Sequence, residues 1–341
     1  MTAAAHPTGP GRTPVGVLVM SYGTPGGPDE VAGYYTHVRR GRPPTPALLA
    51  DLEARYRAIG GVSPLAERTR AQAAGLQAAL DRRRAGAFQV FVGAKHAPPF
   101  IEDAVAAMAG AGLRRAVGLV LAPHYSSLSV GEYQERARAA GRQAGIEVTP
   151  VDSWHLAPGL IALLADRLTA TLAGLPAGVT AGVTAGVSAG VTAGVSARVS
   201  GAAEVLVTAH SLPERILADG DPYPDQLRET AEAVTSLAGV SRWRLAWQSA
   251  GRTPEPWIGP DILEVIRDLP AEGVRAVVVC PAGFTSDHLE VLYDVDIEAR
   301  RLAEDLGLVL ARTPSLNDDP KFMATLAKVV VDALPPEGTD G

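Results

Sequence analysis

Short apolar runs alternate with longer amphipathic segments along most of the chain. In the first half, runs typical of buried strands cover residues 15–20, 88–93 and 116–121. Apolar and charged residues recur at helical spacing over residues 48–59, 67–83 and 101–111. Because strands alternate with helices of ten or more residues, the pattern predicts right-handed crossover units around a parallel sheet.

The second half of the chain repeats this plan. The segment VLVTAHSLP (205–213) has the rhythm of VLVMSYGTP (17–25), with an apolar strand, a polar side chain at its end and a turn that closes on proline. The segment VVCPAGFTS (278–286) resembles LVLAPHYS (119–126) in the same way. We therefore predict an α/β fold of two similar Rossmann-like domains, each a parallel sheet flanked by helices.

The ends of these matched strands are candidates for a binding site. Open parallel sheets bind ligands beyond the carboxyl ends of their strands. The residues at the four matched ends are Tyr22, His124, His210 and the loop after Cys280. We expect them to converge on one active-site cleft between the two domains.

A low-complexity segment interrupts the second half. Residues 177–200 form six tetrapeptides of the type AGVT or AGVS, with Arg198 in place of the last glycine. A period of four drifts by about 40° per repeat around an α-helix, and glycine weakens a strand. An expanded surface loop without function is one interpretation, and an interaction segment or added hairpin is the other. We predict domains over 14–160 and 161–317, with a helix near 318–334 that packs back on the first.

Composition excludes several classes of protein. The 31 basic and 37 acidic residues give a net charge of −6, which argues against a nucleic-acid partner. No apolar run approaches the roughly 18 residues that span a bilayer, and the start MTAAAHPTGPGRTP lacks the apolar stretch of a signal peptide. The single cysteine, Cys280, rules out a disulfide or a four-cysteine metal site within one chain. We expect a cytoplasmic protein without integral membrane contact.

Three acidic residues near the C-terminal end form the most informative cluster. Glu290, Asp294 and Glu298 recur at intervals of four, which places them along one side of a helix. Like charges repel at this spacing, and binding a cation or transferring protons would offset the repulsion. The spacing thus predicts a line of acids that leads from solvent to a buried site. An ordinary solvated helix face with Asp287 as its N-cap is the alternative.

Two further segments carry candidate chemistry. His210 ends an apolar strand, where α/β proteins place ligand-binding groups, although a structural histidine is the alternative. Imidazole and carboxylate together suit Fe, Co or Zn, and both accept protons near neutral pH. The segment YYTHVRRGR (34–42), followed by Arg55, could hold a flat acidic ligand through its guanidinium groups, or be a solvated charge run.

These segments together resemble the ferrochelatases, and within them the coproporphyrin ferrochelatases of Gram-positive bacteria, actinobacteria in particular. The resemblance covers nearly the whole chain and includes YYTHVRRGRPP (34–44), TAHSLPERI (208–216) and GFTSDHLEVLYDVDIE (283–298). It implies a lyase of haem biosynthesis that inserts Fe²⁺ into coproporphyrin III to give iron coproporphyrin. A protoporphyrin IX ferrochelatase, a cobalt chelatase of the same fold and a non-catalytic tetrapyrrole carrier are the alternatives.

The resemblance also implies the roles of individual residues. His210 and Glu290 match the catalytic metal-binding pair of the family, and Tyr22 matches a tyrosine that contacts iron from the opposite face of the porphyrin. Asp294 and Glu298 match acids of an outer metal or proton path. The residues that match porphyrin contacts are Tyr22, Val38, Arg39, Arg40, Arg55, Tyr56, Ser63 and Tyr133.

Cofactors and partners follow from the same resemblance. Some members of the family carry a [2Fe-2S] cluster on four cysteines, and with Cys280 alone we expect no such cluster. We expect no tightly bound cofactor, with Fe²⁺ as a substrate. The expected partners are coproporphyrin III and Fe²⁺, with a downstream enzyme of the haem pathway as a further candidate, and the expected state is a monomer.

Overall fold

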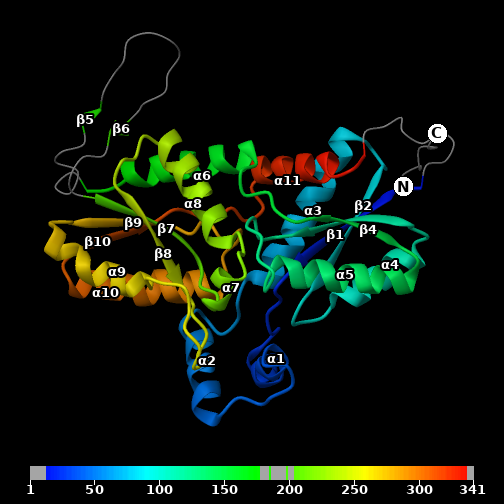
Figure 1. Ribbon diagram of the computed structural model, residues 1–341, viewed down its shortest axis with the longest axis horizontal. Helices are drawn as coiled ribbons and strands as arrows, with labels where there is room; N and C mark the ends of the chain where they lie inside the picture. The colour runs from blue at the N-terminus through cyan, green and yellow to red at the C-terminus, as the bar shows by residue number, and fades with distance from the viewer. Residues whose placement is uncertain (1–12, 177–183, 186–196, 199–202, 336–341) are drawn as a thin grey trace, which may run out of the picture.

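The chain folds into two parallel sheets that lie side by side, each flanked by helices (Figure 1). The computed structural model describes residues 13–176, 184–185, 197–198 and 203–335. The first sheet has the order β2 (Phe88–Ala94), β1 (Val15–Ser21), β3 (Arg115–Val120), β4 (Glu147–Val151). The second has the order β10 (Val309–Arg312), β9 (Ala276–Cys280), β7 (Ala203–His210), β8 (Trp243–Gln248).

The two sheets share one topology. Strands β1, β2, β3 and β4 correspond to β7, β8, β9 and β10, and both sheets then have the order second, first, third, fourth. All neighbouring strands within the two sheets pair in parallel. The correspondence pairs β1 with β7 and β3 with β9, as the matched sequence segments predicted. The prediction of two similar α/β halves is confirmed.

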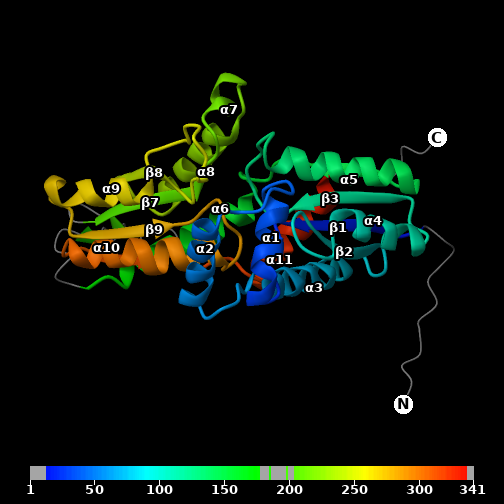
Figure 2. The same ribbon diagram turned by 90° about the horizontal axis from the view of Figure 1, so that it is seen from below.

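Helices cover both sheets and also extend beyond them. Those of the first half are α1 (Val31–Val38), α2 (Pro46–Ala58), α3 (Leu65–Arg83), α4 (Ile101–Gly110) and α5 (Val130–Ala144). The α-helices that follow are α6 (Pro158–Ala173), α7 (Arg215–Ala218), α8 (Tyr223–Leu237), α9 (Ile262–Asp268), α10 (Arg300–Asp305) and α11 (Pro320–Asp332). Helices α1 and α2 lie at the junction of the two halves, on one side of the sheets (Figures 1 and 2).

Local sequence explains where the outlying helix α2 begins. The Thr45 side chain accepts a hydrogen bond from the Leu48 amide at 3.3 Å, and Pro46 occupies the first helical position. A hydroxyl at the N-cap satisfies an amide that has no partner within the helix, and proline has no amide to satisfy. This start sets the direction of α2, which places Tyr56 in a buried position.

The largest buried core continues from one half into the other. It includes β1 and β7 residues together with apolar residues of α6 and α11. Helix α11 packs against both α3 and α6, and α6 also packs against α8 (Figure 1). The predicted boundary at 160/161 falls within the first turn of α6, and the division into 14–160 and 161–317 remains a prediction.

Only a small part of the repeat segment 177–200 is described. Strand β5 (Thr184–Ala185) pairs with β6 (Ala197–Arg198) in antiparallel fashion, the kind of contact that the hairpin interpretation calls for. The other residues of the repeat lie outside the described part of the chain. Within the described part, no helix is both long enough and apolar enough to cross a membrane.

Candidate active site

The carboxyl ends of both sheets open onto one cavity of about 520 Å³. Its lining includes Tyr22 after β1, His124 after β3, His210 at the end of β7 and residues 283–286 after β9. The expectation that these four strand ends converge is therefore confirmed. The volume is within the range of roughly 300–1,000 Å³ that is common for sites of cofactors and other small molecules.

A glycine allows the loop after β9 to approach β7 closely. A Cβ atom at Gly283 would lie 2.5 Å from Cβ and 2.9 Å from Cα of Ala209, so a larger residue would force the two segments apart. The amide of Gly283 donates to the carbonyl of Thr208 at 3.0 Å. This contact brings the segment that carries His288 and Glu290 beside His210.

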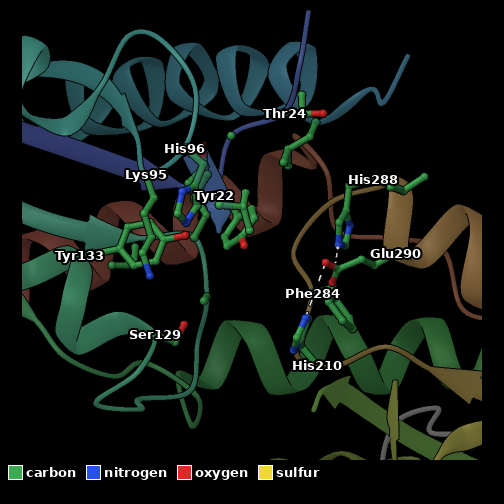
Figure 3. Close-up of a pocket in the computed structure, with 18 of the residues that line it drawn as sticks. Tyr22, Thr24, Lys95, His96, Ser129, Tyr133, His210, Phe284, His288 and Glu290 are labelled. Carbon is green, nitrogen blue, oxygen red and sulfur yellow. Dashed lines mark ion pairs between the residues drawn. The ribbon is translucent and has the colours of Figure 1, made fainter. Parts of the chain in front are cut away.

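Two imidazoles flank one carboxylate on this wall of the cavity. The Nε2 atom of His210 lies 3.7 Å from Oε1 of Glu290, and Nε2 of His288 lies 3.6 Å from its Oε2 (Figure 3). The Nδ1 atoms face the carbonyls of Ser211 and Ser286, respectively. Because a carbonyl can only accept, each Nδ1 carries a proton, and the Nε2 atom of each ring is the one that faces Glu290.

The charges of this group favour an ionised carboxylate. Burial alone would raise the pKa of Glu290, but the neighbouring His210 and His288 outweigh it and lower this pKa to about 2. Burial would lower the pKa of His288, and its contact with Glu290 reverses the direction, so this pKa is raised. The cluster thus combines a permanent negative charge with nitrogen bases, which can attract a divalent cation and accept protons.

The line of acids continues from this cluster on a π-helix, residues Val291–Ala299. Asp294 is buried, and it pairs with Nη1 of Arg55 at 3.1 Å and accepts a hydrogen bond from the Ser249 hydroxyl. Burial, together with the charges of Glu290 and Glu298, raises the pKa of Asp294 to about 7 despite these two contacts. Asp294 therefore exchanges its proton near neutral pH, whereas Glu290 stays ionised.

The helix itself differs from what the spacing implied. A π-helix has roughly 4.4 residues per turn, so acids four apart still share one side, as predicted. π-Helical turns are rare in proteins overall, and those that occur often lie at functional sites.

Asp287, considered as the N-cap, instead accepts hydrogen bonds from Ser315 Oγ at 2.7 Å and Asn317 Nδ2 at 2.9 Å. It ties the loop after β9 to the segment before α11, so the N-cap assignment is wrong.

The opposite wall carries neutral aromatic groups. Tyr22 faces this side of the cavity, with its ring centre 4.6 Å from that of His96 (Figure 3). Burial raises the pKa of the Tyr22 phenol, and the charge of Glu290 adds to the effect. Burial also lowers the pKa of His96 to about 3, assisted by the positive charge of Lys95. Both rings are therefore neutral, in contrast to the ionised Glu290 across the cavity.

Comparison with known proteins agrees with this arrangement. A family model described as Ferrochelatase matches residues 14–334. The chain belongs to the ferrochelatase family. Coproporphyrin III ferrochelatase of Anoxybacillus flavithermus is 46% identical over 327 residues, which cover 95% of this chain and 98% of the relative. The protein of the same name from Bacillus subtilis is 43% identical over 326 residues, which cover 95% and 99%.

The organisms and the solved structures refine this membership. Both relatives come from Bacillus-type bacteria rather than from the actinobacteria that we expected. The sirohydrochlorin chelatase SirB from Bacillus subtilis subspecies spizizenii, solved with cobalt, has a TM-score of 0.53 at 12% identity and covers 94% of this chain and 95% of its own. The siroheme-biosynthesis enzyme CbiX has a TM-score of 0.50 at 15% identity, with coverages of 94% and 100%. At these identities the likeness supports the chelatase-type fold alone.

The cavity contains most of the residues that the ferrochelatase resemblance assigned to the porphyrin. The assigned residues that line it are Tyr22, Val38, Arg40, Tyr56, Ser63 and Tyr133. Arg39 and Arg55 are not among its described lining residues. The Arg39 guanidinium lies over the Tyr35 ring, 5.7 Å from its centre. The Arg55 guanidinium instead contacts Asp51 at 3.2 Å and Asp294 at 3.1 Å.

Sequence reasoning missed several residues of this ferrochelatase-family site, His288, Lys95 and His96 among them. His288 lies two residues before Glu290, so its place in the same motif was an available signal. Lys95 and His96 directly follow β2 and also line the cavity, and the strand-end rule used for Tyr22 would have found them. Among the described residues, no group of three or more His, Cys, Asp or Glu side chains has an arrangement that could hold a metal ion.

Proposed function

We propose that this chain inserts Fe²⁺ into coproporphyrin III and releases iron coproporphyrin and two protons. The observation that carries the proposal is the placement of His210, His288 and Glu290 on one wall of a cavity with Tyr22 on the other (Figure 3). Membership of the ferrochelatase family and the names of the two relatives support the reaction and the substrate.

The chemistry of metallation matches the groups on the first wall. Insertion removes two pyrrole N–H protons and strips water from Fe²⁺. The ionised Glu290 attracts the cation, and the His210 Nε2 atom acts as transient ligand and proton acceptor. His288 supplies a second basic nitrogen beside the same carboxylate, so both protons find an acceptor within the cluster.

The outer acids provide a route between this cluster and solvent. Asp294 has a pKa of about 7, which suits a group that takes up and releases a proton in each turnover. Glu298 follows one turn later on the same side of the π-helix and is half-buried. We propose that protons leave, or hydrated iron arrives, along Asp294 and Glu298, with Arg55 holding Asp294 in place.

The second wall would hold the macrocycle. The tyrosine rings offer apolar faces to a flat ligand, and the Arg40 and Lys95 cations at its edge favour a porphyrin that bears several carboxylates. We propose that Tyr22 meets the metal from this side. We propose that the protein acts as a cytoplasmic monomer without a resident cofactor, and that Arg39 and Arg55 contact carboxylates of the bound substrate.

Anaerobic metallation followed by visible absorbance tests the proposal. The purified protein is mixed with coproporphyrin III or protoporphyrin IX and with Fe²⁺ or Co²⁺. The fastest turnover is expected for Fe²⁺ with coproporphyrin III. Preference for protoporphyrin IX or for Co²⁺ would point to the other chelatases considered, and porphyrin binding without turnover would identify a carrier.

A further inference from the structure

Three charged side chains meet at one edge of the cavity. Glu132 forms ion pairs with Nζ of Lys95 through Oε2 and with Nη2 of Arg40, 3.3 Å away, through Oε1. All three residues line the cavity. They come from the first turn of α5, the segment directly after β2 and the segment after α1, so the fold gathers them from distant parts of the chain. One carboxylate therefore holds two cations at the place where a ligand would bind.

The environment of Lys95 makes this carboxylate important. The Lys95 side chain is only 11% exposed, and its ammonium lies 5.1 Å from the centre of the Tyr133 ring. A buried ammonium is costly unless an anion or a hydrogen-bond acceptor compensates it. Glu132 provides this compensation in the free protein. Arg40, at 82% exposure, extends the same cluster to the mouth of the cavity.

A substrate carboxylate that enters the cavity meets the same two cations. It can satisfy Lys95 and Arg40 as well as Glu132 does, because both anions are carboxylates. Two carboxylates at one pair of cations repel each other. Binding of the substrate carboxylate therefore weakens the ion pairs that Glu132 makes with Lys95 and Arg40. A ligand without a carboxylate at this edge has nothing with which to replace Glu132.

We propose that Glu132 is a specificity-determining residue that occupies a carboxylate site on Lys95 and Arg40 until a carboxylate of the substrate displaces it. This proposal rests on the proposed function, since it takes a multiply carboxylated porphyrin as the substrate. Glu132 thus keeps Lys95 compensated in the empty cavity and weakens the binding of the acidic porphyrin, which also favours release of the equally acidic product.

Binding of coproporphyrin III and of its tetramethyl ester to three proteins tests the proposal. The proteins are the wild type, Glu132→Gln and the control Glu135→Gln, and affinity is followed by porphyrin fluorescence. Glu135 lies on the same helix and pairs with Arg142 at 3.1 Å, and it is absent from the cavity lining. Glu132→Gln should bind the tetra-acid about 3- to 10-fold more tightly, a gain that shrinks with added salt. The tetramethyl ester and Glu135→Gln should show no gain.

A double substitution locates the effect at the cations. In a Lys95→Met background, Glu132→Gln should bring little gain in affinity. The ammonium for which Glu132 and the substrate carboxylate compete is then absent. Unchanged or weaker binding of coproporphyrin III by Glu132→Gln would overturn the inference, even if the wild type metallates this porphyrin normally. A wild type that neither binds nor metallates coproporphyrin III would instead refute the proposed function itself.

Discussion

The two halves of the molecule have the same strand order but carry different chemistry at corresponding strand ends. Strand β7 ends in His210, whose Nε2 atom points to an ionised carboxylate, whereas β1 is followed by Tyr22, a neutral phenol. The loop after β9 brings His288 and Glu290 to the cavity, and the loop after β3 brings His124. The repeated scaffold sets where functional side chains meet, and the residues at the strand ends decide what each wall does.

The difference also separates the two tasks of a chelatase. The wall from the second half collects the anion and the bases that metal and proton transfer need. The wall from the first half collects aromatic rings and, at its edge, the cations Arg40 and Lys95. This division predicts that substitutions on the wall with His210 and Glu290 change the insertion rate. Substitutions on the wall with Tyr22 should change porphyrin binding or the product.

Among isosteric substitutions, Glu290→Gln is expected to reduce the rate of metal insertion most. The amide keeps the size of the side chain but loses the charge that lies between His210 and His288. The rate of metal insertion should fall by about 10²-fold, while coproporphyrin III affinity stays the same. Single-turnover absorbance and fluorescence titration measure the two quantities, and an unchanged rate would place the chemistry elsewhere.

An intermediate effect, on stability, is expected for Asp294→Asn. The folded state holds a proton on Asp294 up to about pH 7, whereas an unfolded aspartate loses it near pH 4. The folded wild type thus binds more protons in this window, and the stability contribution of Asp294 is lost as pH rises through it. Asparagine does not titrate, so the stability of the variant does not fall in this way. The unfolding free energy of Asp294→Asn minus that of wild type should therefore be about 1–3 kcal/mol larger at pH 8 than at pH 4.

Urea unfolding at several pH values measures this difference. Asp296→Asn is the matched control, since Asp296 lies on the same π-helix and pairs with Arg312 at 2.8 Å. A pH dependence that is the same for Asp294→Asn and wild type would show that Asp294 is ionised throughout the range.

The smallest effect is expected for Tyr22→Phe. The ring that faces His96 is kept, and only a neutral hydroxyl is lost. Insertion should slow by about fivefold or less, the equivalent of one contact of about 1 kcal/mol. The visible spectrum of the enzyme-bound iron product should nevertheless change if the phenol contacts the metal. A loss as large as that of Glu290→Gln would break the division between the walls.

The sequence predicted the framework of the fold and part of the site, for a physical reason. Strands β1 and β7 are almost entirely buried, so they appear as largely apolar runs, and the polar candidates Tyr22 and His210 stand at their carboxyl ends. The pairs Arg55 with Asp294 and Lys95 with Glu132 join residues that are far apart in the sequence, and no local pattern reveals them. The π-helix was missed because its extra residue per turn has no compositional signature.

His210→Ala provides the most direct test of the division between the walls. The substitution removes the Nε2 atom beside Glu290 and leaves the lining of the tyrosine wall intact. The measurement is anaerobic single-turnover metallation of coproporphyrin III by Fe²⁺, with the bound porphyrin titrated in the same preparation. We predict porphyrin affinity close to wild type and an insertion rate lower by about 10²- to 10⁴-fold. Near-normal insertion, or loss of porphyrin binding in a folded variant, would contradict the account.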